Sequence, residues 1–86
     1  MDTTMAHLEI LMFAGLKANF HTNRLMISTE TPLSVKKLLD LIISLHPNLS
    51  EFINKSLVAC NGQVVELSKL ITEKDEIALL PPMSGG

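Results

Sequence analysis

The feature that most constrains the fold is one amphipathic helix set between stretches of strand-like sequence. Apolar residues recur at three- and four-residue spacing along one helical face, at Val35, Leu38, Leu39, Ile42 and Leu45. Ser34 is a suitable N-cap, and Leu33 and Leu38 are spaced as a hydrophobic staple. Pro47 disfavours helical geometry at His46. The sequence therefore predicts a helix over residues 35–45.

Short alternating segments on both sides of this helix predict strands. In residues 7–13, Leu8, Ile10 and Met12 share one face, and Leu11 and Phe13 share the other. Asn61-Gly62 is typical of a tight hairpin turn. The remaining strands are expected at residues 24–29, 57–60, 63–65 and 76–80. In the last of them, Ile77 and Leu79 face one way, and Ala78 and Leu80 face the other. Strands on both sides of a single main helix predict an α+β fold, one sheet with the helix packed across it.

The other segments are expected to be irregular. Residues 1–6 look like a frayed leader, residues 14–23 like a connection, and residues 48–56 like a link with Phe52 and Ile53 turned inward. With 86 residues the chain forms one domain. We expect a folded body over about residues 7–80 and a flexible tail over residues 81–86.

Composition excludes several classes of function. The formal net charge is −2, and no Lys/Arg cluster interleaves with aromatic residues, which argues against nucleic-acid binding. No apolar run reaches the ~18 residues that a membrane span needs. The first residues lack a cationic signal-peptide region, and one cysteine cannot form an internal disulfide. A soluble, cytoplasmic protein with no membrane or nucleic-acid partner is expected.

Catalytic side chains are not evident. Cys60 lies within an apolar strand without a neighbouring acid or base, so a small buried hydrophobe is the better interpretation. The three histidines, His7, His21 and His46, have no metal-ligand spacing with Cys60. We therefore expect no metal and no cofactor bound by this chain.

The C-terminal segment carries the predicted chemistry. Pro81 and Pro82 end the last strand and stiffen the exit into an extended arm. Gly85 and Gly86 lack a Cβ, so the arm can enter a narrow channel in another protein. The α-carboxylate of Gly86 is ionised at neutral pH and can attack the α-phosphate of ATP. The alternative is an ordinary glycine-rich terminus.

Several segments resemble the small subunit of molybdopterin synthase, the MoaD family of ubiquitin-like sulfur carriers. The most specific is the ending Asp75-Glu76-Ile77-Ala78-Leu79-Leu80-Pro81-Pro82-Met83-Ser84-Gly85-Gly86. Residues 11–17 resemble the family's first strand, and residues 57–61 resemble its apolar strand that ends in Asn. Lys17 stands where Arg is usual, and Glu73-Lys74 where an acidic residue and Gly often precede the last strand.

This resemblance implies a ubiquitin-like β-grasp fold and a sulfur-transfer cycle. An E1-like enzyme, using ATP and Mg, would adenylate Gly86, and a sulfur donor protein would convert the adenylate to a thiocarboxylate. The tail, including Met83 and Ser84, would then enter the large synthase subunit and give sulfur to cyclic pyranopterin monophosphate during molybdenum cofactor biosynthesis. The implied assembly is a heterotetramer, and the chain would not be catalytic alone.

An apolar patch beside the tail is a candidate partner surface. Leu11, Phe13, Val64 and Leu80 are expected on the sheet face away from the helix. Ordinary packing beneath a loop would explain them equally well. Lys17 can hold a partner carboxylate or orient the tail.

Two other functions stay open. The same carrier chemistry can serve thiamine thiazole, tRNA thiolation or cysteine synthesis, although the proline pair favours the synthase. A ubiquitin-like modifier, joined through Gly86 to protein lysines, is the alternative from a different class.

Overall fold

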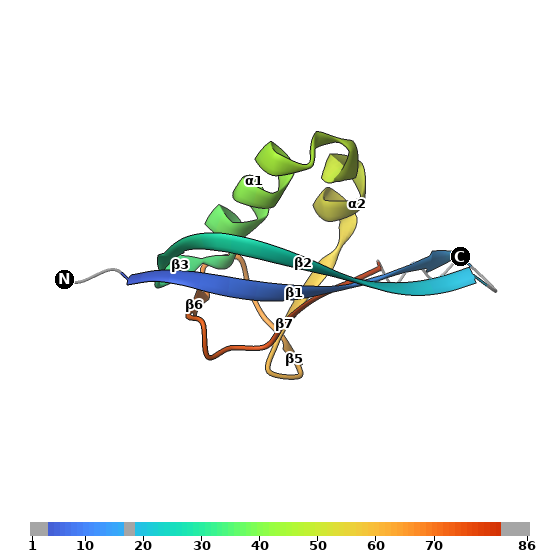
Figure 1. Ribbon diagram of the computed structural model, residues 1–86. Helices are drawn as coiled ribbons and strands as arrows, with labels where there is room; N and C mark the ends of the chain where they lie inside the picture. The colour runs from blue at the N-terminus through green and yellow to red at the C-terminus, as the bar shows by residue number, and fades with distance from the viewer. Residues whose placement is uncertain (1–3, 17–18, 82–86) are drawn as a thin grey trace.

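The fold places a layer of helices on one side of a mixed β-sheet (Figure 1). The structure is a computed structural model that describes residues 4–16 and 19–81, with the backbone alone for 13–16 and 19–23. Its elements are β1 (Thr4–Leu16), β2 (Asn19–Thr31), β3 (Leu33–Ser34), α1 (Val35–Leu45), η1 (Pro47–Leu49), α2 (Ser50–Lys55), β4 (Leu57–Cys60), β5 (Gln63–Val64), β6 (Leu70–Ile71) and β7 (Ile77–Leu80).

The main sheet has five strands in the order β2-β1-β7-β4-β5. Strands β1 and β7 pair in parallel, whereas β1–β2, β4–β7 and β4–β5 pair antiparallel. A separate two-stranded sheet joins β3 to β6. The predicted α+β architecture, a mixed sheet crossed by one main helix, is confirmed.

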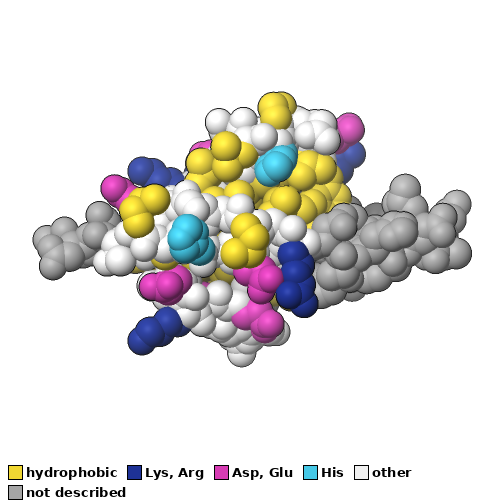
Figure 2. Space-filling model, in the orientation of Figure 1, with side chains coloured by type: hydrophobic (Ala, Val, Ile, Leu, Met, Phe, Trp, Pro, Cys, Tyr) yellow, Lys and Arg dark blue, Asp and Glu magenta, His cyan; other side chains and the backbone are white. Residues whose placement is uncertain are grey.

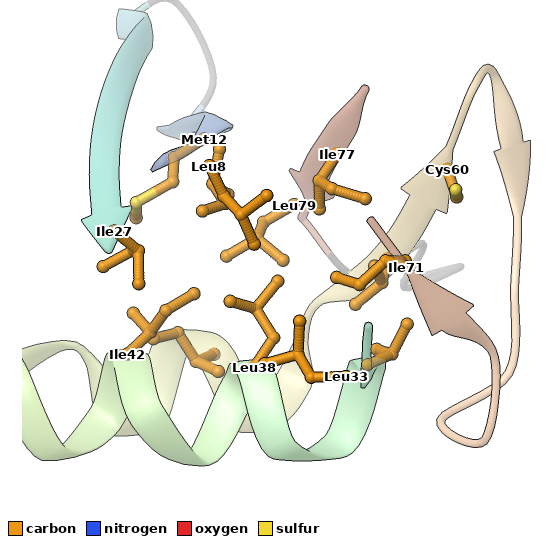
Figure 3. Packing of buried hydrophobic residues seen from close by; sticks show 14 residues of the cluster. Leu8, Met12, Ile27, Leu33, Leu38, Ile42, Cys60, Ile71, Ile77 and Leu79 are labelled. Carbon is orange, nitrogen blue, oxygen red and sulfur yellow. The ribbon is translucent and has the colours of Figure 1, made fainter. Parts of the chain in front are cut away.

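The core lies between α1 and the sheet, and alternate residues of each strand supply it. Figure 3 shows Leu38 and Ile42 of α1 directed toward Leu8, Ile27 and Leu79 of the strands. The predicted inward faces of β1 and β7 are confirmed, because Leu8, Ile10, Met12, Ile77 and Leu79 are all buried. The core is built from aliphatic side chains together with Met12 and Cys60.

Helix α1 begins and ends where the sequence predicts. The Ser34 side chain accepts a hydrogen bond from the Lys37 amide at 3.1 Å, as an N-cap does. The amides of Val35 and Lys36 donate to carbonyls of residues 69 and 67, so the loop before β6 also caps the helix. The His46 amide donates to Ile42, and Pro47 then starts a short 3₁₀ turn.

The first hairpin is longer than expected. Residues 14–16 pair with residues 19–21, so the predicted connection over 14–23 is wrong; only residues 17–18 separate the two strands. The expected leader is also wrong from Thr4 onward, because Thr4–Ala6 pair with β2 and Ala6 is buried. Ladder hydrogen bonds along 13 residues outweigh the weak local preference of Gly and Asn for turns.

Residues 48–56 are mostly helical, so the predicted irregular link is wrong. Residues 47–49 form η1 and residues 50–55 form α2. Ile53 is buried and Phe52 half-buried, so their predicted inward orientation is correct. The Ser56 hydroxyl donates to the Phe52 carbonyl at 2.8 Å and closes the helix. No helix in the described part of the chain is long and apolar enough to span a membrane.

Candidate functional site

Strand β7 carries the chain toward its C-terminal segment from the middle of the sheet. It lies between β1 and β4, and its inward residues Ile77 and Leu79 are fully buried. Leu80 and Pro81 are half-buried, and Pro81 is the last residue that the structure describes. The predicted tail residues Pro82, Met83, Ser84, Gly85 and Gly86 lie outside the described residues. The body therefore anchors the segment through both neighbours of β7.

A group of hydrogen bonds, which we call the polar bracket, joins the start of β7 to the β4–β5 turn. Asn61 Nδ2 donates to Asp75 Oδ1 at 2.9 Å, and Asn61 Oδ1 accepts from the Glu76 amide at 2.9 Å. The Asn61 amide donates to the Glu76 carbonyl, and the Thr72 amide donates to Asp75 Oδ2. Asn61 has a positive φ of 53°, which Asn tolerates better than most residues. This bracket sets the direction in which β7 enters the sheet.

The same hydrogen bonds change the pKa of the Asp75 carboxyl group. The hydrogen bond from the Thr72 amide, followed by the one from the Asn61 side chain, lowers the pKa of the Asp75 carboxyl below its ordinary value. The folded state thus favours the ionised form. This contribution to stability is present above the ordinary pKa of about 3.9 and disappears as the pH falls through the lower, folded-state pKa.

Replacing Asp75 by Asn is expected to lower the free energy of unfolding by about 1–2 kcal/mol at pH 7, because an NH₂ group replaces one of two accepting oxygens. The deficit relative to wild type should shrink below about pH 4, where the native carboxyl also takes up a proton. Urea unfolding at a series of pH values measures both effects. Glu73→Gln is the control, since the Glu73 side chain is exposed and makes no hydrogen bond among the described residues. An equal pH dependence in both variants would contradict the role of Asp75.

An apolar row crosses four strands on the face away from α1. Leu11 pairs with Ala78, Ala78 with Ala59, and Ala59 with Val64. These side chains share one face, because directly opposed residues of a sheet point the same way. We call these four residues the open-face row. Since it runs from β1 to β5, it spans all of the sheet except β2.

Beside the row lies a hollow of about 320 Å³. Leu80 closes it toward the exit of β7, and Glu76 and Gly62 complete its lining with Leu11, Ala59 and Ala78. Val64, next along the row, is 60% exposed. The arrangement can receive apolar side chains of another protein close to the point where the C-terminal segment leaves the body.

The structure brings together three of the predicted partner-binding residues. Leu11, Val64 and Leu80 lie on the open face as expected. Phe13 lies in β1, but its side chain is outside the described residues, and Lys17 is wholly outside them. Ala59 and Ala78 were not predicted as site residues, although they connect Leu11 to Val64. Strand alternation placed Ala78 on the Leu80 face, but only the strand order shows that Ala59 is its neighbour.

Cys60 is buried in the core of the domain. Cys60 is only 4% exposed, and burial raises the pKa of its thiol, so the reactive thiolate is disfavoured. Its predicted role as a small buried hydrophobe is confirmed. Among the residues that the structure describes, no group of three His, Cys, Asp or Glu side chains is arranged to hold a metal.

Several known proteins are similar to this chain in sequence and in fold. The ThiS family model matches residues 10–86. A molybdopterin synthase sulfur carrier subunit from Drosophila erecta is 31% identical over 87 residues, covering 99% of this chain and 97% of that protein. The subunit of the same description from Arabidopsis thaliana is 27% identical over 85 residues, covering 99% and 88%.

Two solved structures have a similar fold. SAMP1 from Haloferax volcanii superposes with a TM-score of 0.71 at 25% identity, covering 94% of this chain and 100% of that one. A chain from the complex of subunits 1 and 2 of the Helicobacter pylori molybdopterin-converting factor has a TM-score of 0.63 at 24% identity, with 94% and 100% covered, and supports the fold. The resemblance noted in the sequence is therefore confirmed, and the chain belongs to the ThiS family, with relatives among the sulfur carrier subunits of molybdopterin synthase.

Proposed function

We propose that this chain is the sulfur-carrying small subunit of a cytoplasmic molybdopterin synthase and that Gly86 is its reactive residue. The main support is the alignment of nearly the whole chain with proteins described as sulfur carrier subunits of that enzyme. The ending Pro81-Pro82-Met83-Ser84-Gly85-Gly86 fits a tail that delivers a terminal carboxylate. The chain itself carries the sulfur atom, and partner proteins catalyse the reactions.

The proposed cycle begins with adenylation. The Gly86 carboxylate attacks the α-phosphate of ATP in an E1-like enzyme that holds Mg, and pyrophosphate leaves. A sulfur donor protein then supplies the sulfur that displaces AMP, which yields the thiocarboxylate. In the large subunit this sulfur forms a bond to cyclic pyranopterin monophosphate, and water then cleaves the bond between the Gly86 acyl carbon and sulfur, which regenerates the Gly86 carboxylate. Two such transfers supply the two sulfur atoms of one dithiolene.

The open-face row is the proposed contact for the large subunit. It is apolar, it lies beside the exit of β7, and its hollow is lined mainly by aliphatic side chains. Docking there would aim the tail into the partner's active site, because Leu80 belongs both to the hollow and to the last strand. Two small subunits bound to a large-subunit dimer would make the proposed heterotetramer.

Val64→Arg is expected to weaken binding of the large subunit by at least about tenfold, since it places a charge in a desolvated contact. Isothermal titration calorimetry measures the affinity, and thermal unfolding checks that the fold is retained. Val64 is 60% exposed, so the free protein should keep its stability.

Leu70→Arg is the matched control for this substitution. Leu70 is 59% exposed, but it lies in β6 of the two-stranded sheet, outside the open-face row. Binding close to wild type is expected. If Val64→Arg binds as tightly as Leu70→Arg, the row is not the contact for the large subunit.

A reconstitution tests the function as a whole. Protein bearing a thiocarboxylate at Gly86 is mixed with large synthase subunit and cyclic pyranopterin monophosphate, and dithiolene pterin is quantified. We expect one dithiolene for every two thiocarboxylates consumed. A thiocarboxylate that forms but is not consumed would show that the recipient is different and belongs to a thiazole, tRNA or cysteine pathway. Conjugation of Gly86 to protein lysines in the presence of ATP would instead support a modifier.

A further inference from the structure

The outer edge of β2 has no partner strand among the residues that the structure describes. Strand β2 ends the five-stranded sheet and pairs only with β1. It is 13 residues long, so it presents a long row of backbone donors and acceptors. Such an edge pairs readily with another strand, unless side chains prevent it.

The side chains of this edge fit a second copy of the same strand. We propose that two copies of the chain associate through antiparallel pairing of β2 with β2, centred on Ile27. In this register Arg24 lies opposite Glu30 of the second copy, and the two-fold symmetry repeats the pair. Opposite charges directly across a strand pair attract, and like charges repel. The two charges therefore favour this register.

The register also keeps the buried and exposed faces aligned. Arg24, Met26, Ser28 and Glu30 are exposed, whereas Ile27 is buried and Leu25 half-buried. A pairing centred on a residue matches exposed positions with exposed ones and inward positions with inward ones. The helices of both copies would then cover the same side of one continuous ten-stranded sheet.

A hollow with a mixed polar and apolar lining lies beside this edge. It has a volume of about 300 Å³, and its lining consists of Thr29, Glu30, Pro32, Leu33, Lys37 and Leu41. In the proposed register, Leu25 of the second copy lies opposite Thr29 on the inward face, adjacent to this hollow. Figure 2 shows further hydrophobic side chains exposed where the helical layer meets the strands. Contact between the exposed part of Leu25 and the apolar side of this hollow would add some apolar area to the backbone pairing.

This association leaves the open-face row available. Strand β2 is separated from β7, β4 and β5 by β1, so the exit of β7 stays outside the contact. The inference rests on the edge of β2 and the hollow beside it, and it does not depend on the proposed sulfur-transfer function.

A charge exchange tests the register. Sedimentation equilibrium is run on the full chain from about 1 μM to about 1 mM, a range that covers weak to moderate association. Arg24→Glu and Glu30→Arg, each alone, are expected to raise the dimer dissociation constant at least about tenfold, because each creates two like-charge pairs. The double variant restores opposite charges and should return to within about threefold of wild type.

Lys36→Glu is the control for the loss of an ion pair. Arg24→Glu also breaks an ion pair within the chain, because Arg24 lies 3.1 Å from Glu9. Lys36→Glu breaks a similar ion pair, since Lys36 lies 3.2 Å from Asp40 on α1, away from the edge of β2. Lys36→Glu should leave dimerisation unchanged, and thermal unfolding confirms that every variant is folded. A wild-type chain that stays monomeric over the whole range would overturn the proposal. So would a dimer that is insensitive to Arg24→Glu, or a double variant that fails to recover.

Discussion

A single alanine added after Gly86 is expected to abolish sulfur transfer and leave the stability of the fold unchanged. The extension converts the Gly86 carboxylate into an amide, which cannot form an acyl adenylate as a carboxylate does. The new terminal carboxylate belongs to a residue with a Cβ and lies one residue further from β7, so it should not fit a channel suited to glycine. Stability should be unaffected because the added residue follows all the described elements.

Two measurements check this result. Intact-mass spectrometry after incubation with the activating enzyme, ATP and a sulfur donor shows whether one oxygen has been replaced by sulfur, and it also verifies that Gly86 is the terminal residue. Dithiolene formation reports the transfer. An alanine added before Met1 is the matched control and should retain activity. Full activity of the C-terminal extension would exclude the Gly86 carboxylate as the carrier group.

Leu38→Ala is expected to produce the largest loss of stability that we predict. Leu38 is fully buried and lies where α1 meets the sheet (Figure 3). Truncating such a leucine typically costs about 3 kcal/mol, the sum of lost apolar burial and the cavity left behind. For a domain of this size that is a large part of the total stability, and the unfolding midpoint should fall by roughly 15 °C.

Leu45→Ala is the control within the same helix. Leu45 is 55% exposed, so the same substitution should change stability by less than about 0.5 kcal/mol. Calorimetry on both variants gives the comparison. Equal losses would show that α1 does not use Leu38 as its central contact with the sheet.

The local features of the fold could be predicted because they depend on neighbours in sequence. The spacing of apolar residues and the Ser34 cap were sufficient for α1, whose bounds are as expected. The alternation in β1 and β7 identified their buried faces correctly. The full length of the β1–β2 hairpin and the β3–β6 pair were not predicted. Those elements form because backbone groups far apart in the sequence pair with one another, and the periodicity of the sequence does not predict that pairing.

The candidate site likewise has some features that the sequence predicts and others that only the tertiary structure shows. The sequence alone indicates Gly86 as the carrier residue, because the proposed covalent chemistry needs only one terminal carboxylate. Its role stays a prediction. Period-two alternation was enough to put Leu11, Val64 and Leu80 on one face. Only the strand order β1-β7-β4-β5 joins them through Ala78 and Ala59 into a continuous row. The hydrogen bonds of Asn61 likewise exist only in the folded chain, because they join it to Asp75 and Glu76, which lie 14 and 15 positions further along the sequence.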